Sequence, residues 1–446
     1  MPTTIWSGFR KKTLKERLNQ VKSYFRLSDI PSLDTQTADN MIENCIGTMA
    51  MPLGLALNLN LNNRPCIIPM VVEEPSVVAA VSGAAKLISA NGGFITQQPT
   101  KNIIYSQVQL LDILDSDLTR FVTILTNDKD HIVSLANALC PSMVKRGGGV
   151  VDMSVRIIKK SNPTSKNSSQ WLVIHFHIDV CDAMGANIAT TVAEGMAPYL
   201  ANICNARIGF RIVSNLATER ISKAKFKIPI SSLDYKGFTG LQVAERIIEA
   251  YEWAKDDPYR AVTHNKGIMN GIDAVAVATG QDWRAIEAAS HAWASLKNPT
   301  LGYQPLTEYW IEQDDSGIRF LVGELCLPIC VGTQGGVLKT NPSYQYALSI
   351  MENPTSKQLA ISMVAVGLAQ NFAALRALAT EGIQKGHMAL HARNIAISVG
   401  APNQSIGECV AHMIETNQIT QMAAKEYLEA KRLLEKITGH EQVILA

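Results

Sequence analysis

The 446-residue chain has little net charge and lacks the patterns that mark several common protein classes. Its 41 basic and 39 acidic side chains leave +2, which gives no global reason to expect nucleic acid or an anionic membrane as partner. The eight cysteines form no CxxC pair, so we expect neither a zinc site nor a disulfide framework. No apolar block follows the basic residues near the start, so we expect no secretory leader.

Long apolar runs are also absent. The longest uncharged apolar stretch, Gln358 to Leu375, is interrupted by Ser362, Gln370 and Asn371. A membrane span needs about 20 predominantly apolar residues, so this stretch is predicted to be a buried core helix. With 47% hydrophobic residues, the chain has enough apolar material for a large core, and its length is typical of two or three domains. We expect a cytoplasmic protein with no membrane partner.

The order of the predicted elements indicates an α+β fold. Between 103 and 213 the segments follow the order β-α-β-β-α-β, with a helix over Asp128–Leu139, which is typical of a split βαβ sandwich. Before it, residues 66–72 are predicted to be a strand, and Pro75–Ala90 a helix with a proline in its first turn. From about Thr380 onward the sequence favours helices.

Two adjacent carboxylates, Glu73 and Glu74, lie between the predicted strand and the helix, followed by Pro75 and Ser76. If this turn lies at the mouth of a cleft, burial would raise the pKa of one carboxyl and make it a proton donor near neutral pH. Acidic residues are also common at helix N-termini without any such function. On this segment alone, the second interpretation is favoured.

Large polar side chains lie beside glycines between residues 260 and 273. The polar residues are Arg260, His264, Lys266 and Asn270, and the glycines are Gly267 and Gly271. An ammonium group beside a reacting carbonyl stabilises the oxyanion that forms when hydride adds. Losing one such donor costs about 2.7–4 kcal/mol of barrier. A solvated loop is the alternative, and it is modestly favoured when the segment is taken by itself.

The segment Asp182-Ala-Met184-Gly185-Ala-Asn187 joins a predicted strand to a predicted helix. A helix N-terminus that carries glycine can receive a pyrophosphate. The GxGxxG pattern is absent, which excludes a standard Rossmann interpretation. A simple turn with an aspartate cap is equally compatible with these residues.

Two histidines, His387 and His391, stand one helical turn apart. HExxH is absent and the spacing suggests no third ligand, so no metal is predicted. A histidine with a pKa near 6.5 can protonate a leaving group at neutral pH. Packing on a polar helix face is the alternative, and it is favoured for this pair alone. Asp282 fits a helix N-cap.

Taken together, these segments resemble class II 3-hydroxy-3-methylglutaryl-coenzyme A (HMG-CoA) reductases in order and spacing, from about Arg10 to the 430s. The matching segments are Glu43-Asn-Cys-Ile-Gly47, Val-Val-Glu73-Glu74-Pro-Ser76, Asn91-Gly-Gly-Phe94, Asp182-Ala-Met-Gly-Ala-Asn187, Thr-His-Asn-Lys266-Gly-Ile-Met-Asn-Gly-Ile-Asp, Ala365-Val-Gly-Leu-Ala-Gln370-Asn and Gly-His387-Met-Ala-Leu-His.

The resemblance implies three parts. Residues 1–102 and 214–380 would form the large HMG-CoA-binding domain, and residues 103–213 an inserted, ferredoxin-like, non-Rossmann NAD(P)-binding domain. Residues 381–446 would form a helical C-terminal flap domain. The family also implies a homodimer, or an assembly of dimers, with the active site at the subunit interface.

The reaction implied by the resemblance takes HMG-CoA to mevalonate and coenzyme A in two hydride transfers, with mevaldehyde between them. Lys266 would stabilise the oxyanion and Glu74 would donate a proton to the aldehyde oxygen. Asp282 would tune both, and His387 would protonate the coenzyme A thiolate. Substrate contacts would be Ser76, Arg260, Asn270, Arg10, Gln370 and His391. Cofactor contacts would be Asp182, Met184, Gly185, Asn187 and Asn215.

NADH-using relatives can carry an acidic residue where this chain has Cys140, with Lys145 and Arg146 close by. These residues weakly favour NADPH over NADH, because a 2′-phosphate prefers positive charge. The sequence leaves open an enzyme that mainly oxidises mevalonate in catabolism. A catalytically silent binding protein is disfavoured, since a degenerate member is expected to lose at least one residue of the catalytic set: Glu74, Lys266, Asp282 and His387.

Overall fold

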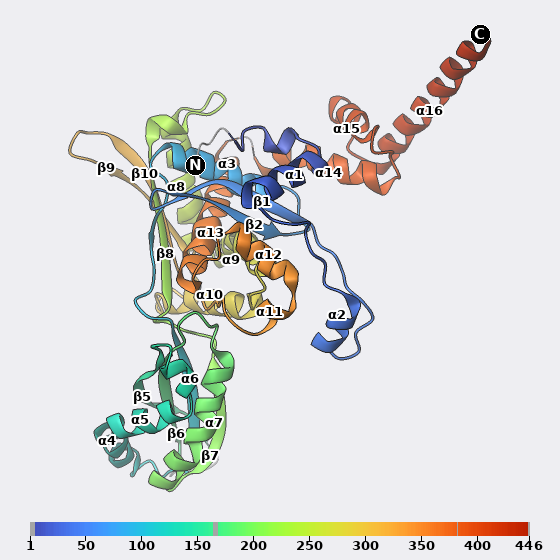
Figure 1. The fold of residues 1–446 in the computed structure, drawn as a ribbon. Helices are drawn as coiled ribbons and strands as arrows, with labels where there is room; N and C mark the ends of the chain where they lie inside the picture. Colours follow the sequence, from blue (N-terminus) through green and yellow to red (C-terminus); the bar gives the residue numbers. More distant parts are fainter. Residues whose placement is uncertain (1–4, 164–167, 381, 445–446) are drawn as a thin grey trace.

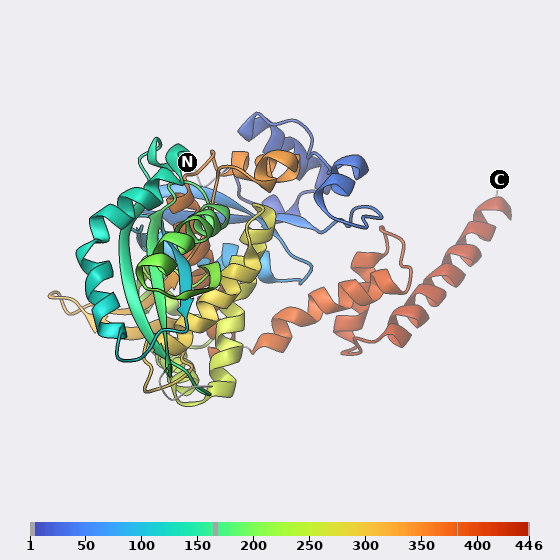
Figure 2. The ribbon, with the colours of Figure 1, turned by 90° about the horizontal axis from the view of Figure 1, so that it is seen from below.

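The computed structural model describes residues 5–163, 168–380 and 382–444, and only the backbone of 383–390 and 435–444. Figure 1 shows a central body around α13, a lobe built from β4 to β7 below it, and the helices α14 to α16 projecting to one side. The view in Figure 2, turned by 90°, shows the same projection of α16 away from the body.

The central body contains a four-stranded antiparallel sheet of order β3-β8-β10-β9 and a two-stranded sheet, β1-β2. The strands are β1 (Leu53–Leu61), β2 (Arg64–Val71), β3 (Ile95–Gln97), β8 (Ile221–Pro229), β9 (Thr307–Gln313) and β10 (Arg319–Pro328). Its helices are α3 (Val77–Ala90), η2 (Ile230–Leu233), α8 (Gly240–Asp256), α9 (Pro258–Ala278), α10 (Trp283–Leu296), α11 (Val337–Thr340), α12 (Pro342–Ile350) and α13 (Ser356–Ala379).

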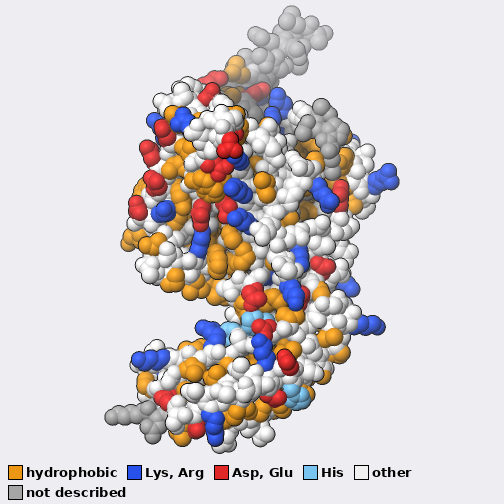
Figure 3. Space-filling model, turned by 90° about the vertical axis from the view of Figure 1, so that its left-hand side faces the viewer, with side chains coloured by type: hydrophobic (Ala, Val, Ile, Leu, Met, Phe, Trp, Pro, Cys, Tyr) orange, Lys and Arg blue, Asp and Glu red, His pale blue; other side chains and the backbone are white. Residues whose placement is uncertain are grey.

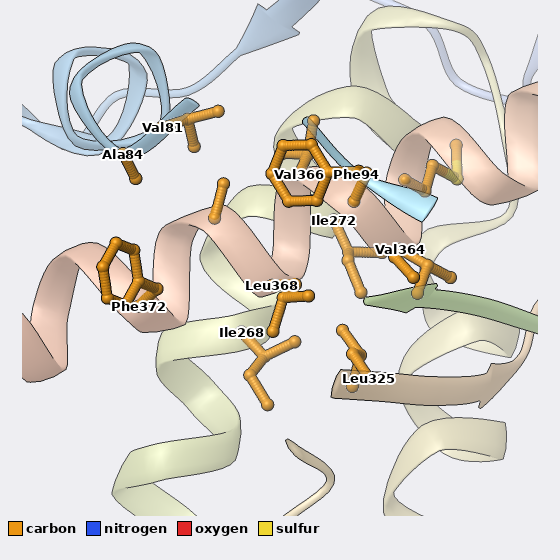
Figure 4. Close-up of a cluster of buried hydrophobic side chains, with 14 of the residues drawn as sticks. Val81, Ala84, Phe94, Ile268, Ile272, Leu325, Val364, Val366, Leu368 and Phe372 are labelled. Atoms are coloured by element: carbon orange, nitrogen blue, oxygen red, sulfur yellow. The ribbon is translucent and has the colours of Figure 1, made fainter. Parts of the chain in front are cut away.

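Helix α13 lies at the centre of this body and is apolar on nearly all sides, as expected of a helix surrounded by other elements. Figure 4 shows Phe372 of α13 below Val81 and Ala84 of α3, with Ile268 of α9 packed beneath the helix. Among the described residues, α13 alone is long and apolar enough to cross a membrane, and 83% of its apolar window is buried inside the protein. The prediction of a buried core helix is confirmed.

The lobe has an antiparallel sheet of order β5-β6-β4-β7, the strand order of a ferredoxin-like sandwich. Its elements are β4 (Ile103–Leu111), α4 (Leu118–Asn127), α5 (Lys129–Ala138), α6 (Pro141–Val144), β5 (Gly149–Lys159), β6 (Gln170–Asp179), α7 (Ala186–Ile203) and β7 (Arg207–Ser214). The helices enclose a hydrophobic core formed within residues 104–213. Figure 3 shows the lobe as a separate mass, with the surface indented between it and the body.

The remaining helices lie at the two ends of the chain: η1 (Phe9–Lys11), α1 (Leu14–Phe25), α2 (Thr35–Met41), α14 (Ile383–Ser398), α15 (Ile406–Glu415) and α16 (Gln421–Ile444). The helix α1 packs on the body through Val21 in a cluster with Trp6, Leu57 and Ile67. The C-terminal helices share a small core of their own around Cys409.

One predicted helix begins later in the structure than expected, and two elements were not predicted. The helix predicted from Pro75 begins at Val77, because Ser76 has a φ of 80° that a right-handed helix does not allow. Strand β1 was not predicted, since it carries Asn58 and Asn60, a residue type depleted in strands. Helix α4 was also missed, because its threonines, valine and isoleucine favour strands.

Candidate active site

An ion pair joins the turn before α3 to the middle of α9. Lys266 Nζ lies 3.2 Å from Glu74 Oε2. The side chains are 62% and 38% exposed, respectively, so both remain accessible to a ligand. An ammonium group and a carboxyl group in contact can stabilise a developing oxyanion and transfer a proton to it.

The ion pair lines a cavity of about 920 Å³ bounded mainly by α3, α9 and α13, with the C-terminal helices at one edge. Seven of the residues predicted to contact substrate or catalyse the reaction line it: Arg10, Glu74, Ser76, Arg260, Lys266, Asn270 and Gln370. The structure therefore gathers most of the predicted substrate site in one place.

The polar segment that includes Lys266 is part of a 21-residue helix, α9, and the loop alternative is wrong. Asp257 caps the helix by accepting a hydrogen bond from the Tyr259 amide at 2.9 Å, and Pro258 occupies its first turn. At Gly271, a Cβ atom would lie 3.1 Å from the Cβ of Gln370. This glycine allows α9 and α13 to pack closely, which brings Gln370 to the cavity.

A buried hydrogen-bond network underlies the cavity. His264 Nε2 lies 2.5 Å from Thr307 Oγ1, and Tyr309 donates to Asn371 Oδ1 at 2.8 Å. Asn371 in turn donates to the backbone carbonyl of His264 at 3.3 Å. Burial, and secondly the charge of Arg260, lowers the pKa of His264 to about 3, so the imidazole is neutral at pH 7. The network fixes α9 against β9 and α13.

Arg260 is half-buried and has its guanidinium 5.9 Å from the Trp253 ring centroid. Burial lowers its pKa, and among the described residues no carboxylate pairs with it. A half-buried guanidinium without a counter-ion is suited to a planar carboxylate, which it can bind through two parallel hydrogen bonds.

Asp282 lies outside this cavity. It caps α10 by accepting a hydrogen bond from the Ala285 amide at 3.1 Å, as predicted, and Arg284 Nη2 lies 3.3 Å from its Oδ1. Ala278, at the end of α9, lies twelve positions beyond Lys266, a rise of about 18 Å. One chain therefore does not place Asp282 beside the Glu74–Lys266 pair.

The predicted cofactor residues cluster where the lobe joins the body. Gly185 caps α7 with a φ of 108°, and a Cβ there would lie 2.6 Å from Val180 Cγ1, so the position requires glycine. Asp182 Oδ1 accepts hydrogen bonds from the amide and hydroxyl of Ser356 at 2.8 and 2.9 Å. Asn187 and Asn215 are both exposed.

A second cavity, of about 410 Å³, lies beside this cluster. The lobe lines it with Arg146, Val180, Cys181, Asp182 and Ala183, and the body with Gln334, Gly335 and Lys339. Asp282 follows Gln281, whose side chain exchanges two hydrogen bonds of 2.9 Å with the backbone of Gly332. A Cβ at Gly332 would lie 2.4 Å from the Met184 amide nitrogen, so Gly332 packs against the predicted cofactor residues. Asp282, next to Gln281, therefore lies on the same side of the chain as these residues.

The predicted histidines lie on α14. The side chain of His387 lies outside the described residues. His391 is exposed and does not line the first cavity, whereas Arg393 of the same helix does. The sequence prediction missed Arg393, Asn371 and Arg376 as residues of the cavity. The last two lie within or just beyond an apolar run, which indicated only a core helix.

Comparisons with known proteins agree with this arrangement. Residues 9–392 match the family model of hydroxymethylglutaryl-coenzyme A reductase. The chain is 42% identical over 432 residues to a 3-hydroxy-3-methylglutaryl-coenzyme A reductase of Archaeoglobus fulgidus, covering 95% of this chain and 94% of that one. A probable enzyme of the same name from Borreliella burgdorferi is 35% identical over 399 residues, 87% of this chain and 86% of that one.

Solved structures from Streptococcus pneumoniae share the fold. One 3-hydroxy-3-methylglutaryl-coenzyme A reductase superimposes with a TM-score of 0.78 and 38% identity, over 95% of this chain and 99% of that one. A class II enzyme bound to NADPH in open conformations gives a TM-score of 0.77 at 38% identity, over 84% of this chain and all of that one. These matches define an oxidoreductase. The chain belongs to the hydroxymethylglutaryl-coenzyme A reductase family, and the α+β fold inferred from the sequence is confirmed.

Proposed function

We propose that the Glu74–Lys266 pair is the catalytic centre at which this reductase converts HMG-CoA to mevalonate and coenzyme A. In the first reduction, hydride adds to the thioester carbonyl, the C–S bond breaks and the protonated thiol leaves, giving mevaldehyde. In the second, hydride adds to the aldehyde and the alkoxide takes a proton. The contact of 3.2 Å between Lys266 and Glu74 inside the cavity carries this proposal.

Each reduction puts negative charge on the same oxygen. Lys266, which is 62% exposed and lines the cavity, is placed to stabilise that charge, and Glu74 beside it to deliver the proton. The cleavage of the thioester needs a separate acid for the departing thiolate. By resemblance, that acid is His387 of α14, in the flap domain 381–446.

Substrate binding is assigned to the other polar residues of the same cavity. Arg260 holds the free carboxylate of the HMG group, because its guanidinium is half-buried and lacks a counter-ion among the described residues. Ser76 and Asn270 line the cavity near the ion pair. Arg10 and Gln370 of the cavity are assigned to the coenzyme A part, together with His391 of α14, which by resemblance joins them although it does not line the cavity in the single chain.

The lobe, residues 103–213, is assigned to the nicotinamide cofactor, which supplies the hydride when bound. The α7 N-terminus at Gly185 has no side-chain cap, and Arg146 and Lys339 line the adjoining cavity, so the residues fit an anionic dinucleotide. Asp182, Met184, Asn187 and Asn215 complete the set. NADPH is favoured over NADH because Arg146 lines the cavity, whereas Cys140 is buried in the core of the lobe.

Two copies of the chain are proposed to build each active site. One chain keeps Asp282 and the cofactor residues away from the Glu74–Lys266 pair, so a partner is needed to bring the two groups together. The arm around α2 carries apolar side chains that the rest of the described chain does not cover, including Ile46 at 105% and Met49 at 88% exposure. Such a surface favours self-association into a homodimer.

The large domain is assigned to residues 1–102 and 214–380, because the body has its own hydrophobic core, separate from those of the lobe and the C-terminal helices. The burial of α13 within that core supports a cytoplasmic location, which fractionation of cells expressing a tagged chain would test.

The proposed reaction is tested by following NADPH oxidation, and separately NADH oxidation, with purified protein and HMG-CoA. We expect two cofactors consumed per thioester, with mevalonate and free thiol as products and NADPH the better donor. A chain that oxidised neither cofactor, and formed no NAD(P)H from mevalonate and coenzyme A, would contradict the proposal.

A further inference from the structure

The first cavity extends well beyond the Glu74–Lys266 pair. Its lining follows α13 from Gln370 to Thr380, a rise of about 15 Å at 1.5 Å per residue. Along this path the facing walls carry small side chains, such as Ala80 of α3 and Ala374 of α13. The cavity is therefore long enough for an extended group in addition to the HMG moiety.

The charge of this cavity is strongly one-sided. Among the described residues that line it, five cations stand against one carboxylate, Glu74: Arg10, Arg260, Lys266, Arg376 and Arg393. Chain-wide charges nearly cancel, so this local excess is a feature of the site. Coenzyme A matches it, because its nucleotide carries a pyrophosphate and a 3′-phosphate.

Arg376 is the least explained of these cations. Its guanidinium lies 4.6 Å from the ring centroid of Tyr235, which also lines the cavity. Its Nε is buried without a hydrogen-bond partner, and no carboxylate among the described residues pairs with the side chain. Burial lowers the pKa of Arg376. A half-buried guanidinium without an anion is costly, so its retention beside a cavity points to an anion supplied by a ligand.

A second unpaired atom lies on the same helix. Gln370 is 7% exposed, lines the cavity, and has its Oε1 buried without a partner. It precedes Arg376 by six residues, about 9 Å of helix rise. Coenzyme A has amide N–H groups between its thiol and its pyrophosphate. Its extended arm therefore requires first a hydrogen-bond acceptor, such as Gln370 Oε1, and then a group that donates hydrogen bonds to a phosphate, such as the Arg376 guanidinium.

We propose that Arg376, held by stacking on Tyr235, binds a phosphate of the coenzyme A nucleotide and so selects the full thioester over shorter ones. The assignment rests on the proposed use of this cavity for HMG-CoA. Arg260 lies on the other wall, on the helix of Lys266, and remains available for the HMG carboxylate.

The test compares HMG-CoA with the pantetheine thioester of the same acid, which lacks the nucleotide. For Arg376→Met we expect the KM for HMG-CoA to rise about 10–100-fold, the range for a lost charge-assisted hydrogen bond, with kcat within about twofold. The KM for the pantetheine thioester should not change. An equal rise for both thioesters would place Arg376 at the HMG end, and no rise for either would remove it from binding; both outcomes overturn the proposal.

Two variants control for structural effects. Arg376→Lys keeps the positive charge but loses the planar guanidinium group, so its KM for HMG-CoA should lie between that of the wild type and that of Arg376→Met. Arg246 lies near the end of α13, donates to the Ala379 carbonyl at 3.1 Å and stacks on Phe238, but does not line the cavity. Arg246→Met should leave the ratio of the two KM values unchanged; a shift as large as that of Arg376→Met would contradict the proposal.

Calorimetry separates this proposal from the catalytic one. Free coenzyme A should bind the wild-type chain more tightly than Arg376→Met, while pantetheine should bind both alike. This difference is expected even if turnover of HMG-CoA fails. A dephospho-thioester identifies the phosphate: a KM effect that persists with it assigns Arg376 to the pyrophosphate, and one that vanishes assigns it to the 3′-phosphate.

Discussion

Lys266 of α9 and Glu74 of the turn before α3 are 192 residues apart in the sequence, and their charged atoms lie 3.2 Å apart in the structure. Their side chains stay accessible because the surrounding α3, α9 and α13 leave a cavity at this contact. The pair is thus built by tertiary packing of the central body.

Removing the cation of this pair should abolish most turnover. For Lys266→Ala we expect kcat to fall about 10²–10³-fold, the effect of losing one preorganised oxyanion donor. Lys86→Ala is the matched control, because Lys86 lies on the exposed face of α3 outside the cavity lining. Steady-state kinetics of HMG-CoA reduction measures both; full activity in Lys266→Ala would overturn the proposed mechanism.

Mixing two inactive variants should restore activity if each site draws on two chains. In a heterodimer of Lys266→Ala and Asp282→Ala, one of the two sites would contain both an intact Lys266 and an intact Asp282. With random exchange of subunits, about a quarter of the wild-type rate should return. The variants are mixed under conditions that exchange subunits and then assayed. No recovery, despite exchange verified with differently tagged chains, would show that both residues act from one chain.

The contribution of Asp273 on α9 to the stability of the chain should fall as pH rises between about 4 and 8. Burial, and secondly the neighbouring Glu287, raises the pKa of Asp273 from 3.8 to about 8. The folded state therefore keeps a proton that the unfolded state loses, and the stabilisation present at low pH is lost through this window.

Asp273→Asn cannot ionise, so its free energy of unfolding should depend less on pH and exceed that of the wild type at pH 8 by roughly 1–3 kcal/mol. Denaturant unfolding at pH 5 and pH 8, at one protein concentration, measures this difference. Asp256→Asn, at the exposed end of α8, is the control and should follow the wild type. If the stability of Asp273→Asn relative to the wild type did not increase from pH 5 to pH 8, while Asp256→Asn followed the wild type at both, the assigned sign would be contradicted.

Deleting residues from about Thr380 should abolish turnover while the body remains folded. The C-terminal helices have a separate core around Cys409, whereas the body and the lobe keep theirs without it. If closure of this segment over the site gates catalysis, the truncated chain should still bind NADPH, as fluorescence titration would show. A truncated chain with full activity would rule out a catalytic role for the segment.

Local sequence patterns predicted helices well where the apolar residues had a clear helical spacing or formed a long uncharged run. The helix predicted over Asp128–Leu139 agrees with α5 to within one residue at each end, and Ile132 and Ala136, one turn apart, are buried on its inner face. The run from Gln358 to Leu375 is correctly buried, because no charged residue interrupts it. The sequence pattern failed where the amino-acid composition favours a different structure. Helix α4 is rich in β-branched residues, which favour strands, yet it forms a helix that packs one apolar face on the lobe.

The sequence by itself determined the family, through long motifs in order, and the residue types that the chemistry needs. It also determined positions with a strict local requirement, such as glycine at 185, where φ is 108°. Only the tertiary structure decided that Lys266 meets Glu74, that Asp282 lies with the predicted cofactor residues, and that Arg376 lines the cavity. These relationships depend on how distant helices pack, and no pattern within one helix encodes the distance to another.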